Sequence, residues 1–155
     1  MIILALDPGR NKTGFAFVDF DGRLLASGIF PTDEREKFFD ELESSSPKFL
    51  SWLKEGSTDN FNEPVSLIII GNGTTSGEFS LYVQERASCE IISVDEKNTT
   101  LEARELYWKI HRPGLITRLL PEGLRVPKRT LDDLAAWAVA LRGLKKYRDI
   151  RRNRL

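Results

Sequence analysis

The chain has little of what many catalytic and metal-binding sites are made of. Its 155 residues include one cysteine, Cys89, and one histidine, His111. A lone cysteine excludes a disulfide framework and a thiolate zinc site, and a lone histidine argues against a histidine-dependent triad. The longest apolar runs, such as VSLIII at 65–70, are far shorter than the roughly 20 residues of a membrane-spanning helix, and no signal-peptide pattern precedes them. These absences predict one cytoplasmic domain over residues 1–155, with no membrane partner.

Both halves of the chain contain acidic and basic residues, but the balance between them differs. Residues 1–96 contain 8 Lys and Arg against 17 Asp and Glu, whereas residues 97–155 contain 15 against 6. A basic half can indicate a nucleic-acid partner, and solvated basic helix faces are the plain alternative. With 41% hydrophobic residues the chain is otherwise typical of a globular domain with a sizeable core.

Apolar runs and turn signals predict a sheet that begins as a meander. The first run, 2–6, is continuously apolar, as in a strand buried on both faces. Asp21-Gly22 lies between the next two runs and is a strong hairpin signal. The predicted strands are 2–6, the runs on either side of Asp21-Gly22 (15–18 and 24–30), 65–71 and 90–95.

Helical spacing of apolar residues predicts helices between and after these strands. They are one or two helices within 32–53, broken near Ser46-Pro47, a helix at about 78–86, one capped by Thr99 or Thr100, and a long final helix capped by Thr130. Residues 55–64 and most of 113–129 are predicted as loops. The order of elements predicts an α/β fold with a mixed sheet flanked by helices.

Polar residues follow several of these predicted strands. Asp7 ends the first, Asn72 the fourth and Asp95-Glu96 the fifth, and Asp132-Asp133 opens the final helix. Ligands of open α/β sheets bind beyond the carboxyl ends of the strands, so these side chains converge if the strands are neighbours. Taken singly, each acid is also explained as a turn former or as a favourable helix start.

Clustered carboxylates raise one another's pKa unless a cation lies between them. Mg²⁺, or Mn²⁺, suits a site of few carboxylates with water and phosphate oxygens. Two such ions about 4 Å apart hold the attacking water and the leaving oxygen of a phosphodiester, without histidine or cysteine. The loops DPGRNKTG and GNGTTSG supply glycines for close approach and candidate phosphate contacts, Arg10 and Lys12 among them. The sequence therefore predicts hydrolysis of a nucleic-acid backbone.

Four segments, LALDPGRNKTGFAFVD, LIIIGNG, ISVDEKNTTLEARELYW and LDDLAAWAVAL, together resemble the YqgF/RuvX group of the RNase H-like nucleases, relatives of the RuvC Holliday-junction resolvases. The resemblance implies a five-stranded mixed sheet in the order 3-2-1-4-5. It implies a Mg²⁺- or Mn²⁺-dependent nuclease that matures pre-16S ribosomal RNA or resolves Holliday junctions. Asp7, Glu96 and Asp132 match the catalytic metal ligands, with Asp95 and Asp133 as auxiliary acids.

The sequence departs from the family pattern near its proposed substrate contacts. Lys97 replaces an arginine, and Gly71-Asn72-Gly73 replaces Gly-Leu-Pro. A nucleic-acid-binding module with weak or lost catalysis is therefore the alternative, whereas a sugar-kinase or actin type would need a second domain. The predicted partner is RNA or branched DNA, bound by a monomer or homodimer. The predicted substrate-binding residues are Arg10, Lys12, Asn72, Thr74, Lys97, Lys128 and Arg129.

Overall fold

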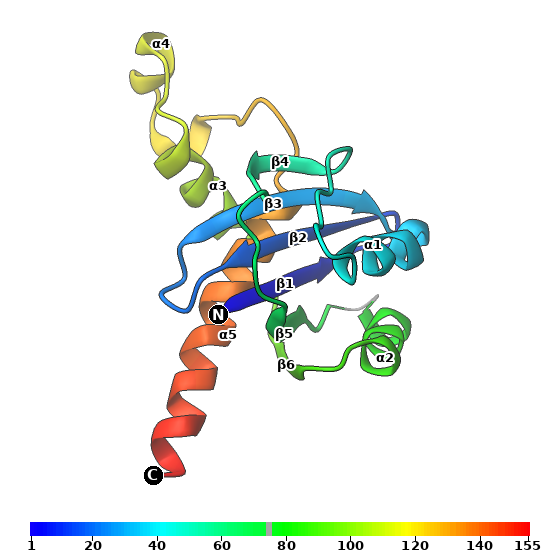
Figure 1. Cartoon of the computed structure of the whole chain (residues 1–155). Helices are drawn as coiled ribbons and strands as arrows, with labels where there is room; N and C mark the ends of the chain where they lie inside the picture. Colours follow the sequence, from blue (N-terminus) through cyan, green and yellow to red (C-terminus); the bar gives the residue numbers. More distant parts are fainter. Residues whose placement is uncertain (74–75) are drawn as a thin grey trace.

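The computed structural model describes residues 1–73 and 76–155, and its centre is one mixed β-sheet (Figure 1). The strands are β1 (Ile2–Pro8), β2 (Lys12–Val18), β3 (Leu24–Pro31), β4 (Leu53–Gly56), β5 (Val65–Gly71) and β6 (Glu90–Val94). They lie in the order β4-β3-β2-β1-β5-β6. Each of the strands β1 to β3 pairs antiparallel with the next one along the chain, whereas β5 lies parallel to both β1 and β6.

The order of five of these strands confirms the predicted order 3-2-1-4-5, but the prediction of five strands is wrong. The sixth is β4, a short edge strand that pairs with β3 through Ala26, Ser27 and Gly28. Its sequence, LKEG, has no apolar alternation strong enough to mark a strand. Its pairing depends on the neighbouring strand rather than on local propensity.

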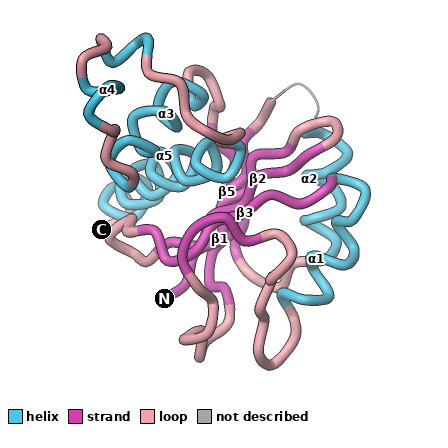
Figure 2. Tube along the Cα trace, turned by 90° about the horizontal axis from the view of Figure 1, so that it is seen from above, coloured by secondary structure: helices cyan, strands magenta, loops and turns pink. Residues whose placement is uncertain are grey.

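Helices cover both faces of the sheet. They are α1 (Arg35–Leu42), α2 (Ser76–Arg86), α3 (Thr99–Ile110), α4 (Leu115–Arg118) and α5 (Asp132–Asn153), with short 3₁₀ turns at Thr32–Glu34 and Glu122–Leu124. Figure 2 shows α1 and α2 on one side of the sheet and α3, α4 and α5 on the other. The predicted α/β fold with flanking helices is confirmed.

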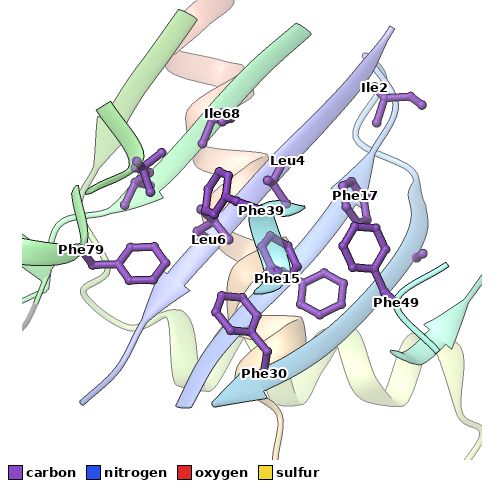
Figure 3. Packing of buried hydrophobic residues seen from close by; sticks show 14 residues of the cluster. Ile2, Leu4, Leu6, Phe15, Phe17, Phe30, Phe39, Phe49, Ile68 and Phe79 are labelled. Carbon is purple, nitrogen blue, oxygen red and sulfur yellow. The ribbon is translucent and has the colours of Figure 1, made fainter. Parts of the chain in front are cut away.

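Alternate residues of β1 supply two separate cores. Ile2, Leu4 and Leu6 face the core under α1 and α2, which is rich in phenylalanine (Figure 3). Phe30 and Phe38 stack there with ring centroids 4.3 Å apart. Ile3 and Ala5, on the other face, pack with Val139, Ala140 and Leu144 of α5. The first strand is therefore buried on both faces, as its continuous apolar run predicts.

Two glycines allow α5 to lie close on the sheet. A Cβ at Gly14 of β2 would come within 1.9 Å of the Asp132 carbonyl oxygen, and a Cβ at Gly143 within 2.3 Å of the Ile69 side chain. Close approach at both points fixes α5 across β2, β1 and β5. The beginning of α5 is thereby held beside the carboxyl end of β1, because Gly14 is the partner of Asp7 in the β1–β2 ladder.

Several local predictions are wrong. The helix expected within 32–53 is only α1, because the apolar residues after it fold back into the phenylalanine-rich core; Phe49 is 2% exposed there and has a φ of 51°. Thr130 and Thr100 cap no helix: no side chain caps α3 or α5, which begin at Thr99 and Asp132. In the part of the chain that is described, no helix is long and apolar enough to cross a membrane.

Candidate active site

Asp7, Glu96 and Asp132 come together at one edge of the sheet. Asp7 is the penultimate residue of β1, and Glu96 follows the parallel strand β6, two positions away across β5. Parallel neighbours end at the same edge, so the two acids approach one another although 89 positions separate them in the sequence. Asp132, the first residue of α5, reaches the same edge through the contact at Gly14. The predicted convergence of these three acids is what the fold produces.

The Glu96 side chain occupies a space that two glycines leave open. Cβ atoms at Gly71 and Gly73 would come within 2.1 Å and 2.2 Å of its two carboxylate oxygens. Its backbone is fixed by Thr99, whose amide and hydroxyl both donate to the Glu96 carbonyl, at 3.0 and 2.9 Å. The Gly-Asn-Gly sequence, a departure from the family pattern, is thus compatible with the acid site, because both glycines make room for Glu96.

The pKa of Asp7 is raised from its ordinary value of 3.8 to about 8. Burial is the largest cause, followed by the negative charge of Glu96, a side-chain hydrogen bond with Glu96 and the charge of Asp132. No basic side chain of the described residues is among these causes. The surroundings of Asp7 therefore favour its neutral form when no cation is bound.

This donor set fits a hard divalent cation in charge and chemistry. Glu96 Oε1 is buried, and no donor among the described residues bonds to it. A buried carboxylate oxygen with no partner is costly, and a cation that prefers oxygen ligands would satisfy it. Within residues 1–73 and 76–155, however, no three acidic, histidine or cysteine side chains already stand at the spacing of metal ligands. The metal site remains a prediction.

A groove of about 450 Å³ begins at Asp7 and Asp132. Its lining includes Lys12, the first residue of β2, and Arg104 from α3. The sequence reasoning named Lys12 and missed Arg104. Helical spacing could have found it, because Arg104 lies four residues after Thr100, on the face of α3 that also lines the groove. The groove thus places cationic side chains next to an acidic cluster.

Asp133 and Arg129 belong to a second, structural cluster. The Asp133 side chain is fully buried, accepting a 2.6 Å hydrogen bond from the Ser27 hydroxyl and bonds of 2.7 and 3.2 Å from the two terminal nitrogens of Arg129. Arg129 also donates to Glu55 Oε1 of β4, at 2.8 Å, as does His111 Nε2, at 2.6 Å. The structure thus does not bring Asp133 to the acid site as an auxiliary acid. Arg129 borders the groove, but its guanidinium is bonded to Asp133 and Glu55.

The other predicted site residues lie around this edge, and their roles stay predictions. Asp95 forms a turn, in which its Oδ1 accepts the Lys97 amide at 3.0 Å, and its carbonyl accepts a 2.7 Å bond from Arg142 of α5. The Asn72 amide donates to the Val94 carbonyl at 2.9 Å. Five predicted substrate contacts are exposed: Arg10, Lys12, Asn72, Lys97 and Lys128. Thr74 lies outside the described residues.

Comparison with known proteins is informative at the level of the fold. No family model matches the sequence, and no curated protein matches it. Among solved structures, the chain is similar to fowlpox virus resolvase in complex with its substrate, Holliday junction DNA. The TM-score is 0.50 at 10% identity, covering 95% of this chain and 99% of the resolvase chain. The two chains therefore share an α/β fold with a mixed sheet flanked by helices. At this identity the likeness shows the fold alone, and function must be argued from the site.

Proposed function

We propose that the chain is a divalent-metal-dependent nuclease that hydrolyses phosphodiester bonds in structured nucleic acid. One observation carries this proposal: Asp7, at the end of the central strand of a resolvase-like sheet, is partly buried close to Glu96 and Asp132. Like charges are held together in this way where a cation or a reaction requires them. The sequence motifs favour the YqgF/RuvX group within this class.

Each residue of the site has a distinct part in the proposed reaction. Asp7, Glu96 and Asp132 would hold Mg²⁺ or Mn²⁺, and the bound ion would supply the positive charge needed to activate a water and to stabilise a leaving oxygen. Lys12 and Arg104 line the groove that begins at these acids, where they bind backbone phosphates as positive charges. Gly71 and Gly73 leave open the space that the Glu96 carboxylate occupies, and a larger side chain at either position would collide with it.

The substrate follows from two different sources of support. The resolvase of similar fold has Holliday junction DNA as its substrate, which favours branched DNA. The motif resemblance favours the precursor of 16S ribosomal RNA. We propose branched DNA as the first substrate to test, since its support comes from the whole chain rather than from four segments.

The test is cleavage of a labelled four-way DNA junction, and of a pre-16S leader RNA, in Mg²⁺, in Mn²⁺ and in EDTA. Asp7→Asn and Glu96→Gln are expected to abolish cleavage, whereas Asp59→Asn, which changes an exposed acid outside the site, is the matched control. Cleavage of either substrate that survives both EDTA and Asp7→Asn would contradict the proposal.

A binding module without catalysis is the second candidate. It is favoured by the absence, in the described parts of the chain, of three acids already at metal-ligand spacing, and by Lys97, which cannot form the bidentate contact of the family's arginine. Salt-sensitive binding of the junction with no product in Mg²⁺ or Mn²⁺ would establish this second function instead.

A further inference from the structure

Residues 112–128, here called the projecting segment, expose an unusual amount of apolar surface. Leu115, Ile116 and Leu119 are 82%, 83% and 85% exposed, and Leu124 and Val126 follow at 64% and 78%. Single exposed leucines are ordinary, but a group of them in one segment marks an interaction surface. Figure 1 shows α4, within this segment, standing away from the sheet.

The segment and its two ends are also strongly basic. Residues 109–129 contain six Lys and Arg and one Glu. A symmetric contact with a second copy would bring these like charges together, at a cost. A polyanion with apolar parts complements the surface better. Nucleic acid is such a partner, because its phosphates bind the cations while its bases offer apolar faces.

Internal contacts hold the segment in a defined shape. Both of its ends are tied to one carboxylate, since Glu55 Oε1 accepts from His111 at 2.6 Å and from Arg129 at 2.8 Å. Within it, Arg125 Nε donates to the Leu120 carbonyl at 3.1 Å, and Arg118 Nε donates to the Pro113 carbonyl at 3.1 Å. The apolar side chains are therefore presented on a braced support, which lowers the entropy lost on binding.

The segment is continuous with the groove that begins at the acid cluster. Val126 and Pro127, near its end, line that groove together with Asp7 and Asp132. A nucleic-acid arm lying in the groove would therefore meet the projecting segment next to the site of cleavage. A membrane surface also attracts basic apolar segments, but it is flat and would leave unused a groove that holds both acidic and basic side chains.

We propose that the projecting segment is a wedge that inserts Leu115, Ile116 and Leu119 at the branch point of a nucleic-acid junction. Aliphatic wedges separate neighbouring base pairs at a cost of a few kcal/mol per step. That cost is smallest where stacking is already interrupted, so the wedge selects branched over continuous duplex. The inference rests on the proposed nuclease function, to which it adds the feature of the substrate that is recognised.

The test is binding, which does not depend on catalysis. Fluorescence anisotropy, in EDTA, compares a four-way DNA junction with a linear duplex of one arm's sequence. Replacement of Leu115, Ile116 and Leu119 by serine together is expected to weaken junction binding about tenfold, a change of about 1.4 kcal/mol, and to leave duplex binding unchanged. Leu50→Ser, at a leucine 76% exposed on the connection between α1 and β4, is the matched control.

Several results would overturn the wedge. The first is an unchanged junction preference in the triple variant, and the second is an equal loss of affinity for junction and duplex. The third is a concentration-dependent dimer, seen in sedimentation, that the triple variant no longer forms. The fourth is binding to anionic phospholipid vesicles that the triple variant no longer shows. 2-Aminopurine at the branch point provides an independent readout, since wild type is expected to increase its fluorescence and the triple variant is not. If cleavage is absent but the junction preference depends on these three residues, the nuclease proposal fails and the wedge stands.

Discussion

Replacing Asp7 by Asn should stabilise the metal-free protein, and more so as pH rises. In the folded chain the pKa of Asp7 is raised from 3.8 to about 8, by burial first and then by Glu96 and Asp132. Between these two pH values the folded state binds a proton that the unfolded state has lost. Wild-type stability therefore falls with rising pH across this window, and the Asn variant, which cannot ionise, avoids that loss.

The magnitude follows from the size of the shift. A carboxylate whose pKa rises from 3.8 to about 8 destabilises the fold by at most about 6 kcal/mol at pH 8. Because Asp7 is only partly buried, and water and counter-ions screen it, we expect about 2–4 kcal/mol at pH 8 and less than about 2 kcal/mol at pH 5.

The assay is urea unfolding of wild type, Asp7→Asn and Asp59→Asn in EDTA at pH 5 and pH 8. Asp59 is exposed, so its variant should follow wild type at both values. Adding Mg²⁺ at pH 8 should stabilise wild type and reduce the difference, because a cation at the acids stabilises the ionised form. The reasoning fails if Asp7→Asn is no more stable than wild type at pH 8, or if the difference is independent of pH.

Two other sites give independent predictions. Arg129→Met should destabilise the fold by about 3–5 kcal/mol in chemical unfolding, because it leaves the fully buried Asp133 without its ion pair; a loss below 1 kcal/mol would contradict this. Gly14→Ala should lower Mg²⁺-dependent cleavage about 100-fold, since its Cβ would displace the beginning of α5 and with it Asp132. Gly77→Ala, where a Cβ meets open space, should leave the rate unchanged.

The sequence predicts the central strands well and the edge of the sheet poorly. β1 and β5 are continuous apolar runs because both faces are covered, and Asp21-Gly22 marks the β2–β3 hairpin. The edge strand β4 pairs with β3 along one side only, so its four residues carry little pattern of their own. The apolar residues between α1 and β4 are spaced like a helix, but they pack as separate contacts in the core, where Phe49 lies against Phe38.

Some residues of the candidate site could be predicted from the sequence, and others could not. Strand ends predict Asp7 and the pair Asp95-Glu96, because the position of a residue at the end of a parallel strand determines the edge at which it lies. The choice of Glu96 over Asp95 comes from the motif resemblance. Asp132 and Asp133 are indistinguishable in sequence, and successive helical residues point about 100° apart. Only the packing of α5 against Gly14 and Ser27 determines that the first lines the groove and the second is buried.

This pair of acids also shows how the fold tolerates its own acid cluster. The ionised Asp7 carboxylate opposes folding, because it is partly buried and lies close to Glu96 and Asp132. One residue beyond Asp132, Asp133 is held by Arg129, which is joined through Glu55 to β4 and so anchors the beginning of α5 to the sheet. An ion pair of this kind contributes a fixed position more than net stability. The Asp133–Arg129 ion pair holds Asp132 near Asp7 in spite of their mutual repulsion. The proposed cation would then bind acids that the fold has already placed together.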